Sequence, residues 1–228
     1  MVNKTKSAFT LAEVLITLVI IGVVAALTIP VAITKYQKQE TVSRLKKAYS
    51  ALSNALKLSE LNLGDPASNW DFDIDGASFF DRYLRPYIAT AQSNSLTEYQ
   101  EKADVRYLNG NNCVENWCKK NTSYGLNYNA VLSDGTLMIV ESFHFSAITY
   151  KIVSFDLNGL KKPNKIGRDI FTFFISKTKR QVLPFGNKDK REDVLGNLDQ
   201  SCNINYGGEY CTSLIMMDGW QIKDDYPW

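Results

Sequence analysis

The sequence predicts an α+β protein in which a long N-terminal helix packs on a small antiparallel β-sheet head. Three observations predict it: an apolar run at residues 11–29, an amphipathic helical pattern at residues 31–64, and runs of β-branched and aromatic residues in the second half of the chain. The 228 residues are enough for one globular domain and an anchor. We therefore expect a helix with a transmembrane half and an amphipathic half, followed by a globular head at residues 65–228.

The apolar run extends from Leu11 to Ile29, holds 19 residues and contains one charged side chain, Glu13. As a helix it would be about 28 Å long, close to the thickness of a bilayer core. The small residue Ala8 precedes this run, whereas a secretory signal has a shorter apolar core that ends at a small-residue cleavage site. An ordinary signal anchor is the alternative, but it gives no reason for the carboxylate of Glu13.

Glu13 is the residue in this run that requires an explanation. A carboxylate inside a bilayer costs about 2–3 kcal/mol and usually has a partner. Cleavage between Ala8 and Phe9 would create an α-amine four residues before Glu13, and this amine is positively charged at neutral pH. In a helical array the amine of one subunit could pair with Glu13 of its neighbour and fix their axial register. The alternative is a side chain that reaches the headgroups without a partner.

The stretch Ala8-Phe9-Thr10-Leu11-Ala12-Glu13 resembles the prepilin cleavage and methylation motif of type IV pilins and type II secretion pseudopilins. The resemblance implies a type IV pilin-like fold and a leader over residues 1–8. It also implies that a prepilin peptidase cuts before Phe9 and N-methylates it, and that residues 9–30 form a transmembrane and filament-core helix. The family usually has glycine where this chain has Ala8.

Gly22 and Pro30 lie where pilins often place a glycine and a helix-breaking proline. Proline removes one helical hydrogen bond, so we expect a kink or a locally melted segment at Pro30. In filaments of this kind, a melted segment would let subunits slide as the filament stretches.

The resemblance also implies a structural function, as a subunit of a type IV pilus or a type II secretion filament. Its partners would be the prepilin peptidase, other pilin or pseudopilin subunits, and an inner-membrane assembly platform. The precursor would cross the inner membrane once with its head outside the cytoplasm, and then join a cell-surface or periplasmic filament. Basic residues flank both ends of the apolar run, so the positive-inside rule does not decide this orientation.

Residues 31–64 continue as an amphipathic stalk helix. Apolar side chains recur at spacings of three and four and form one stripe: Val42, Leu45, Tyr49, Leu52 and Leu56. The basic side chains between them are expected on the face toward solvent or headgroups. The sequence Gly64-Asp65-Pro66 predicts the end of this helix.

The head is expected to begin with a turn-rich linker and a short helix at residues 76–91, interrupted by Pro86. Most of residues 92–134 are then expected to form loops. Strands are predicted at residues 135–142, 147–155, 169–176 and 180–184. A short helix at residues 209–218, ended by Gly219, completes the predicted elements.

Four cysteines form two pairs that are close in sequence, Cys113 with Cys118 and Cys202 with Cys211. An even number in local pairs favours disulfides, which require an oxidising compartment. Three pairings are possible, and we favour the two local ones. Four reduced, buried thiols are one alternative, and a four-cysteine zinc site is another, although the second spacing is long for such a site.

A possible calcium site lies in a polar loop before the third predicted strand. Asp156, Asn158 and the carbonyl near Leu160 imitate the start of a calcium-binding loop, and Asn164 and Asp169 could supply further oxygen ligands. Related pseudopilins can bind calcium in a loop beside their sheet. The alternative is a hairpin connection that uses Asn, Gly and Pro for its turn geometry.

Nothing in the sequence assembles a catalytic site. His144, the single histidine, lies between Phe143 and Phe145, which favours a packed side chain over a catalytic one. Phosphate-binding loops and zinc-protease motifs are absent from the sequence. We therefore expect a protein that is not an enzyme.

An alternative function is that of a minor pilin that acts as a binding module, for DNA uptake or adhesion, at a filament tip. Residues 161–191 hold ten basic residues against Asp169 and Asp189, a net charge of +8 that could contact phosphates. A solvated hairpin face is the simpler interpretation. The net charge of the whole chain, +2, is unlike that of a dedicated nucleic-acid binder.

Overall fold

The computed structural model describes residues 10–94, 99, 102–114, 118, 128–145 and 148–228. The chain divides into two compact units, residues 1–40 and residues 41–228. One helix, α1 (Leu11–Leu63), begins in the first unit and ends in the second.

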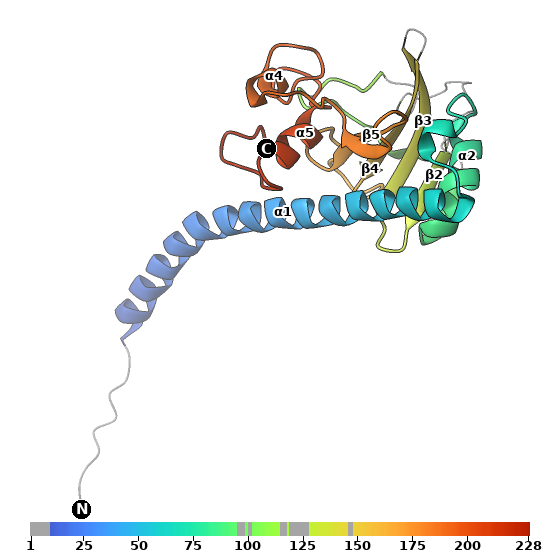
Figure 1. The fold of residues 1–228 in the computed structure, drawn as a ribbon. Coiled ribbons are helices and arrows are strands. Elements are labelled where there is room, and N and C mark those ends of the chain that lie inside the picture. The colour runs from blue at the N-terminus through green and yellow to red at the C-terminus, as the bar shows by residue number, and fades with distance from the viewer. Residues whose placement is uncertain (1–9, 95–98, 100–101, 115–117, 119–127, 146–147) are drawn as a thin grey trace, which may run out of the picture. The chain divides into compact units, whose positions relative to one another are not determined.

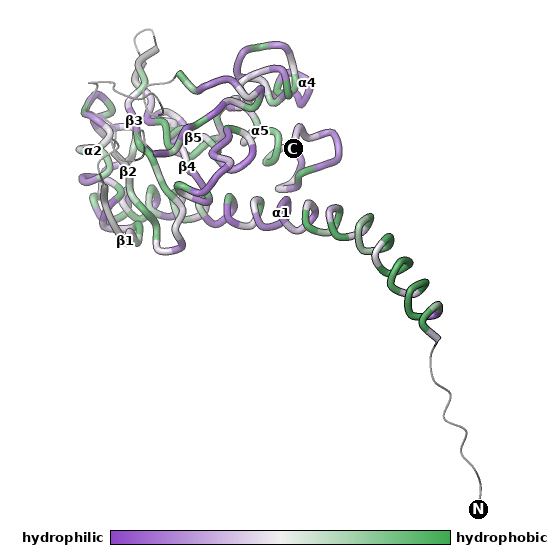
Figure 2. Tube along the Cα trace, turned by 180° about the vertical axis from the view of Figure 1, so that it is seen from behind, coloured by the Kyte–Doolittle hydropathy of each residue, from purple (hydrophilic) through white to green (hydrophobic). Residues whose placement is uncertain are grey.

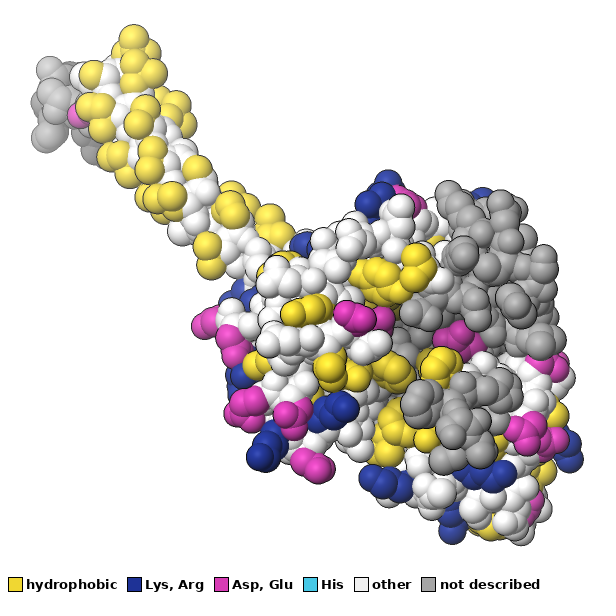
Figure 3. Space-filling model, turned by 90° about the horizontal axis from the view of Figure 1, so that it is seen from above, with side chains coloured by type: hydrophobic (Ala, Val, Ile, Leu, Met, Phe, Trp, Pro, Cys, Tyr) yellow, Lys and Arg dark blue, Asp and Glu magenta, His cyan; other side chains and the backbone are white. Residues whose placement is uncertain are grey.

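The first unit consists of the N-terminal part of α1, with Thr10 at its start. Its large apolar side chains are exposed, including Leu11, Ile21 and Leu27. Figure 2 shows this part of the helix in the colour of hydrophobic residues, and Figure 3 shows hydrophobic side chains along it. Among the described residues, α1 is the one helix long and apolar enough to cross a membrane. The apolar surface therefore needs a bilayer or other helices to cover it.

Helix α1 continues through Gly22 and Pro30, both of which are described residues. The helix is therefore not melted at these positions in this structure, and the kink predicted at Pro30 stays a prediction. Thr34 Oγ1 donates a hydrogen bond of 3.0 Å to the carbonyl of Pro30, and Thr28 Oγ1 donates one of 2.8 Å to the carbonyl of Val24. The loss of one backbone donor at Pro30 is thus compatible with a continuous helix, and melting in a filament stays a prediction.

In the second unit, α1 buries one stripe of side chains. The buried residues are Leu45, Ala48, Leu52, Ala55, Leu56 and Ser59. Their spacing of three and four matches the predicted amphipathic pattern. The helix ends at Leu63, and Gly64 follows with a φ of +63°, a left-handed conformation that glycine adopts readily at a helix end.

Six antiparallel strands form one sheet, in the order of the chain. The strands are β1 (Thr90–Asn94), β2 (Tyr128–Leu132), β3 (Leu137–Phe145), β4 (Ile148–Asp156), β5 (Ile170–Ser176) and β6 (Gln181–Pro184). The last four correspond to the four predicted strands. The prediction that residues 92–134 are mostly loop is wrong at both ends of that range, where β1 and β2 pair with each other.

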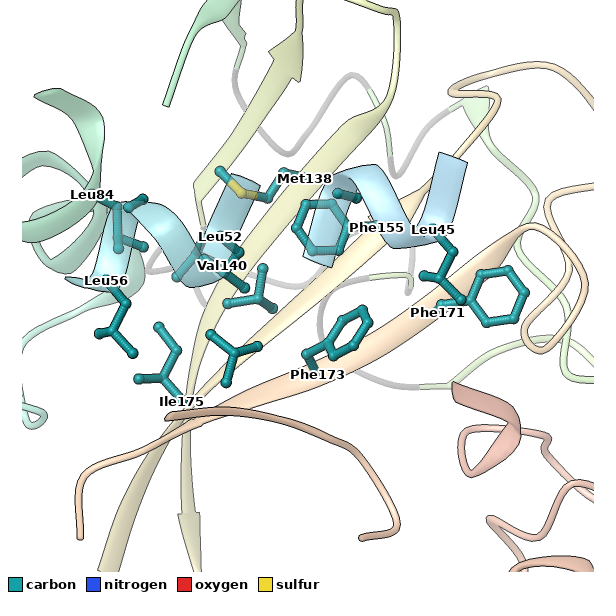
Figure 4. Close-up of a cluster of buried hydrophobic side chains, with 14 of the residues drawn as sticks. Leu45, Leu52, Leu56, Leu84, Met138, Val140, Phe155, Phe171, Phe173 and Ile175 are labelled. Carbon is teal, nitrogen blue, oxygen red and sulfur yellow. The ribbon is translucent and has the colours of Figure 1, made fainter. Parts of the chain in front are cut away.

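One face of the sheet, which we call the inner face, packs against α1 (Figure 1). Figure 4 shows Leu45, Leu52 and Leu56 of α1 beside inner-face residues of β3, β4 and β5. The inner-face residues in this cluster include Met138, Val140, Val153, Phe155, Phe171, Phe173 and Ile175. The registers Val140 to Val153 and Val153 to Phe173 bring these alternate residues into line.

The opposite face, the outer face, is covered over part of its area by a second cluster. This cluster contains Tyr99, Val105 and Ile166 together with Ile139 and Ile170 of the sheet. The disulfide between Cys113 and Cys118 belongs to the same cluster. Residues outside the six strands, such as Tyr99, Val105 and Ile166, therefore form a second apolar layer on the outer face of the sheet.

Short helical segments connect these layers among the described residues. They are η1 (Ala67–Asn69), α2 (Gly76–Phe79), η2 (Phe80–Leu84), η3 (Arg85–Tyr87), α4 (Arg191–Leu195) and α5 (Cys211–Met217). The short helix predicted at residues 76–91 is present as the consecutive helical segments α2, η2 and η3 over residues 76–87, and it ends before β1. The helix predicted at residues 209–218 is α5, and Gly219 follows it with a φ of +72°.

Polar contacts tie α1 to the loops of the sheet. Arg44 Nη1 donates to the carbonyl of Leu157 at 3.2 Å, and Lys47 Nζ lies 2.8 Å from Asp134 Oδ2. Glu60 Oε1 accepts from Arg180 Nε at 2.8 Å. The expectation that the basic side chains of this helix face solvent or headgroups is therefore wrong for Arg44, which is partly buried, whereas Lys47 stays exposed beside its partner.

Lys151 is a buried cation beneath the inner face of β4. Its Nζ donates to the carbonyl of Ile74 and to Ser142 Oγ, and it lies 5.1 Å from the centre of the Phe79 ring. Burial lowers the pKa of Lys151 from 10.5 to about 8, although the nearby carboxylates, led by Asp75, act in the opposite direction. The folded chain therefore releases this proton more readily than the unfolded chain.

Truncation of the buried stripe should destabilise the head. Leu52→Ala leaves a cavity between α1 and the sheet, so we expect the free energy of unfolding to fall by about 2–5 kcal/mol. The measurement is urea unfolding followed by tryptophan fluorescence, because Trp70 is buried in the same core. Leu61→Ala is the matched control: Leu61 is 76 % exposed on the same helix, and its truncation should change the free energy by about 0.5 kcal/mol or less. Equal losses in both variants would contradict this packing.

The lowered pKa of Lys151 predicts that the free energy of unfolding depends on pH. Because its pKa is lowered in the folded chain, its contribution is fully present above pH 10.5 and is lost as the pH falls to about 8. The wild-type chain should therefore gain stability between pH 7.5 and pH 9.5 relative to Lys151→Met, as measured by urea unfolding at both values. Lys161→Met, at an exposed lysine, should show no such difference from the wild type. A pH response of Lys151→Met equal to that of the wild type would refute the assignment.

Candidate functional site

The predicted processing site is the bond between Ala8 and Phe9, and both residues lie outside the described part of the chain. The structure describes the chain from Thr10 onward. Glu13 follows in the first turn of α1. The structure therefore places the carboxylate of the candidate assembly site but not the cleavage site itself.

Thr10 and Glu13 hold each other across the first turn of α1. The backbone N–H of Thr10 donates to Glu13 Oε2 at 2.7 Å, and Thr10 Oγ1 donates to the same oxygen at 2.8 Å. In return, the backbone N–H of Glu13 donates to Thr10 Oγ1 at 3.2 Å. This reciprocal pair is a capping box, which satisfies backbone donors that a helix start leaves free.

The sequence carries a signal for this contact. Thr10-Leu11-Ala12-Glu13 has the pattern Thr-x-x-Glu before an apolar run, which is typical of a capping box. Thr10 is thus a site residue that the sequence prediction missed. The contact holds the Glu13 carboxylate beside the start of the helix, on an otherwise apolar surface.

The structure contains both of the predicted local disulfides. Cys113 and Cys118 are joined with their Cα atoms 6.0 Å apart, and Cys202 and Cys211 are joined at 4.6 Å. The second disulfide belongs to the apolar cluster that includes the inner face of the sheet, and it connects α5 to the segment before it. Reduced thiols and a zinc site are therefore excluded for these four residues in this structure.

The predicted calcium-binding residues lie in the loop between β4 and β5, and four of the five are linked to one another by hydrogen bonds. Asp169 Oδ2 accepts from Asn158 Nδ2 at 3.0 Å and from the backbone N–H of Asn164 at 2.8 Å. Asp156 Oδ1 accepts from the backbone N–H of Asn158 at 3.2 Å. Leu160 lies in the same loop with a side chain that is 44 % exposed.

The two carboxyl groups of this loop are buried in a way that disfavours their charges. Burial raises the pKa of Asp156 well above its usual range, and the charge of Asp169 raises it further. Burial also raises the pKa of Asp169, although backbone N–H groups, first that of Lys165, act against this. Tyr99 donates to Asp156 Oδ2 at 2.7 Å. Neither carboxyl group forms an ion pair with any residue that the structure describes.

Two further oxygen atoms of this loop are buried without a partner. Asn158 Oδ1 and Asn164 Oδ1 accept no hydrogen bond from the described residues. Buried amide oxygens normally have a partner, and hard cations such as Ca²⁺ bind carboxylate and amide oxygens. The loop therefore supplies the types of oxygen that a calcium ion binds, two carboxyl groups and two amide oxygens, although the carboxyl oxygens already accept hydrogen bonds within the loop and from Tyr99.

Three of the basic residues at 161–191 have partners within the chain. Arg180 pairs with Glu60, and Arg168 lies 5.3 Å from the centre of the Trp228 ring. Arg191 Nε lies 2.9 Å from Asp218 Oδ1. Several charges that the sequence made available for phosphate binding thus have partners within the chain. The side chain of His144, the single histidine, lies outside the described residues.

Comparison with known protein families gives two matches. The family model described as "Family of unknown function (DUF6613)" matches residues 31–228, which is most of the chain. The chain belongs to this family, DUF6613. The model described as "Prokaryotic N-terminal methylation motif" matches residues 3–29 of the same chain. No curated protein and no solved structure matches this chain.

The two matches divide this DUF6613 member at the boundary between the apolar run and the rest of the chain. The methylation motif, the apolar helix and the antiparallel sheet together make it a type IV pilin-like protein. The motif supports processing by a prepilin peptidase and assembly with pilin-type subunits, and the apolar helix fits a membrane-anchored precursor. Proteins of this kind are structural, and the DUF6613 match adds no activity.

Proposed function

We propose that this chain is a structural subunit of a type IV pilus or a type II secretion filament. A prepilin peptidase would cut it between Ala8 and Phe9 and methylate the new amine. The chain would then leave the inner membrane, through an assembly platform, for a periplasmic or cell-surface filament. The observation that carries this proposal is the methylation motif joined to an apolar run, residues 11–29, whose single carboxylate is Glu13.

The role of Glu13 follows from the cost of an unpaired charge in an apolar environment. Large apolar side chains surround it along α1, among them Leu11, Val14 and Ile16. If these surfaces pack together in a filament core, water can no longer solvate the carboxylate. Cleavage would create an α-amine on Phe9, four residues before Glu13. The α-amine of a neighbouring subunit would then be a partner of opposite charge for Glu13. Thr10 would hold the carboxylate at the helix start until this pair forms.

The processing step is tested by expression with and without a prepilin peptidase. Intact mass and N-terminal sequencing should show a product that begins at N-methylated Phe9, and only when the peptidase is present. A catalytically inactive peptidase is the control. A chain that keeps residues 1–8 beside an active peptidase would reduce the proposal to a signal-anchored surface protein.

The role of Glu13 in assembly is tested by Glu13→Gln, which keeps the size of the side chain and removes its charge. We expect normal cleavage but a loss of at least roughly tenfold in the filament fraction, because the buried amine then has no anionic partner. Quantitative immunoblotting of sheared filaments against total protein measures this ratio. Glu40→Gln is the control outside the apolar run and should assemble normally. Assembly of Glu13→Gln at the wild-type level would overturn the proposed pair.

As a second function we propose that the loop between β4 and β5 binds one calcium ion through Asp156, Asn158, Asn164 and Asp169. The carbonyl near Leu160 would be a further ligand. The proposal rests on two buried carboxylates without a cation and on two buried amide oxygens without a hydrogen-bond donor. When bound, the ion would neutralise both carboxylates and stabilise the turn between the strands.

Calcium should raise the melting temperature of the full-length chain. At a calcium concentration one hundred times Kd the stabilisation is about 2.7 kcal/mol, or roughly 5–10 °C for a domain of this size. Asp156→Asn and Asp169→Asn should abolish the difference between calcium and chelator, whereas Asp199→Asn, at an exposed residue outside the loop, should keep it. Magnesium should act weakly, because it retains its water ligands. Equal melting temperatures of the wild type in calcium and in chelator would leave the loop as a plain hairpin connection.

A further inference from the structure

The outer face of the sheet carries a groove where the second apolar cluster does not cover it. The cluster covers Ile139 and Ile170, whereas Phe143, Tyr150 and Phe174 of β3, β4 and β5 line the groove. Its volume is about 450 Å³, within the range of about 300–1,000 Å³ typical of ligand sites. We call it the aromatic groove.

Aromatic rings from distant parts of the chain form the walls of the aromatic groove. Phe143 is 44 % exposed, and the rings of Tyr150 and Phe174 meet edge to face with centres 6.0 Å apart. Phe185, after β6, lies 5.9 Å from the ring of Tyr210. The groove therefore offers several ring surfaces at different angles along a pleated sheet.

The floor of the groove includes Gly186, which has a φ of +75°. A Cβ atom at this position would lie 2.2 Å from the ring of Tyr210, so a larger residue cannot fit without displacing the ring. The absence of a side chain here lets the backbone of Gly186 pack directly against the Tyr210 ring.

The rim of the groove is cationic. Lys179 and Lys188 line it, and the Nζ of Lys188 lies 5.5 Å from the centre of the Tyr210 ring. None of the described residues that line the groove is acidic. Glu141 precedes Phe143 by two residues on β3, does not line the groove and has an interaction partner. A ligand of this groove should therefore combine negative charge with flat apolar surfaces.

We propose that the aromatic groove binds single-stranded nucleic acid. Exposed bases would stack on rings such as Phe143, and the phosphates between them would lie near Lys179 and Lys188. Grooves that combine aromatic platforms with positive charge bind single strands without strong sequence preference. A duplex hides the faces of its bases in its own stack, so it cannot use the rings.

The site differs from the charged segment that the sequence highlighted. Arg180 and Arg191 of that segment are paired with carboxylates within the chain, whereas Lys179 and Lys188 line the groove together with the exposed ring of Phe143. The proposal therefore depends on rings and charge together. It does not rest on filament assembly, because one head contains the whole groove.

The test uses the full-length chain in nanodiscs of neutral phosphatidylcholine, so that anionic lipid does not compete. Fluorescence anisotropy with an oligo-dT probe of about 12 nucleotides, a length within the range that such folds cover, measures Kd at several salt concentrations. We expect binding at low salt that weakens as salt rises. Lys179→Ala with Lys188→Ala should lower affinity at least roughly tenfold and reduce the salt slope by about 1.4, because each lost phosphate contact changes it by about 0.7.

Phe143→Ala separates stacking from charge. It should lower affinity about 5- to 100-fold without changing the salt slope, and Phe143→Tyr, which keeps the ring, should restore binding. Lys161→Ala with Lys162→Ala is the matched control, because these exposed lysines lie in the same basic segment but outside the groove. It should bind like the wild type. The Glu13→Gln chain should also bind normally, so a failure of assembly would not be mistaken for a failure of the groove.

Four results would overturn the proposal. One is the absence of binding to oligo-dT at low salt. Another is an equal loss of affinity in the groove variants and in the control lysine pair. Equal affinity for an abasic oligomer of the same length would show that the rings make no contribution. Equal affinity for a duplex of the same sequence would exclude a single-strand site.

Discussion

The contact between one stripe of α1 and the inner face of the sheet supports the rest of the head. Leu45, Leu52 and Leu56 are almost fully buried against strands that lie far from α1 in sequence. Burial of apolar area is the dominant favourable term in folding, and here a single helix provides it for β3, β4 and β5 together. The polar contacts of Arg44, Lys47 and Glu60 lie where α1 meets the loops, so they position the loops around this core.

The elements with a strong local pattern were predictable from the sequence. The stripe on α1 and the strands β3 to β6 have clear periods of helix or strand, and the structure confirms them. Strand β1 (Thr90–Asn94) is polar, with the sequence TAQSN, and has no local preference that favours a strand. It becomes one because the backbone of β2 offers it hydrogen bonds. Such pairing depends on partners far along the chain, which a local pattern does not contain.

The candidate sites likewise divide into those with a local sequence pattern and those without one. Glu13 could be found because one charge in an apolar run is conspicuous, and the loop of Asp156 and Asp169 could be found because oxygen ligands for one ion cluster in sequence. The partner of Glu13 within the chain, Thr10, could have been found from its capping pattern. The aromatic groove could not, because Phe143, Phe174 and Phe185 converge only through the register of the sheet.

Gly186 has a consequence for how this surface could change during evolution. The ring of Tyr210, a core residue, leaves no room for a side chain at this position, so this part of the groove lining is constrained to glycine. The rim has no such constraint, since Thr178 and Lys179 lie in a turn and Lys188 follows the last strand. Substitutions and changes of length are tolerated best in such exposed connections. A protein with this head could therefore acquire a new ligand preference by variation of two turns, while the fold that holds them stays as it is.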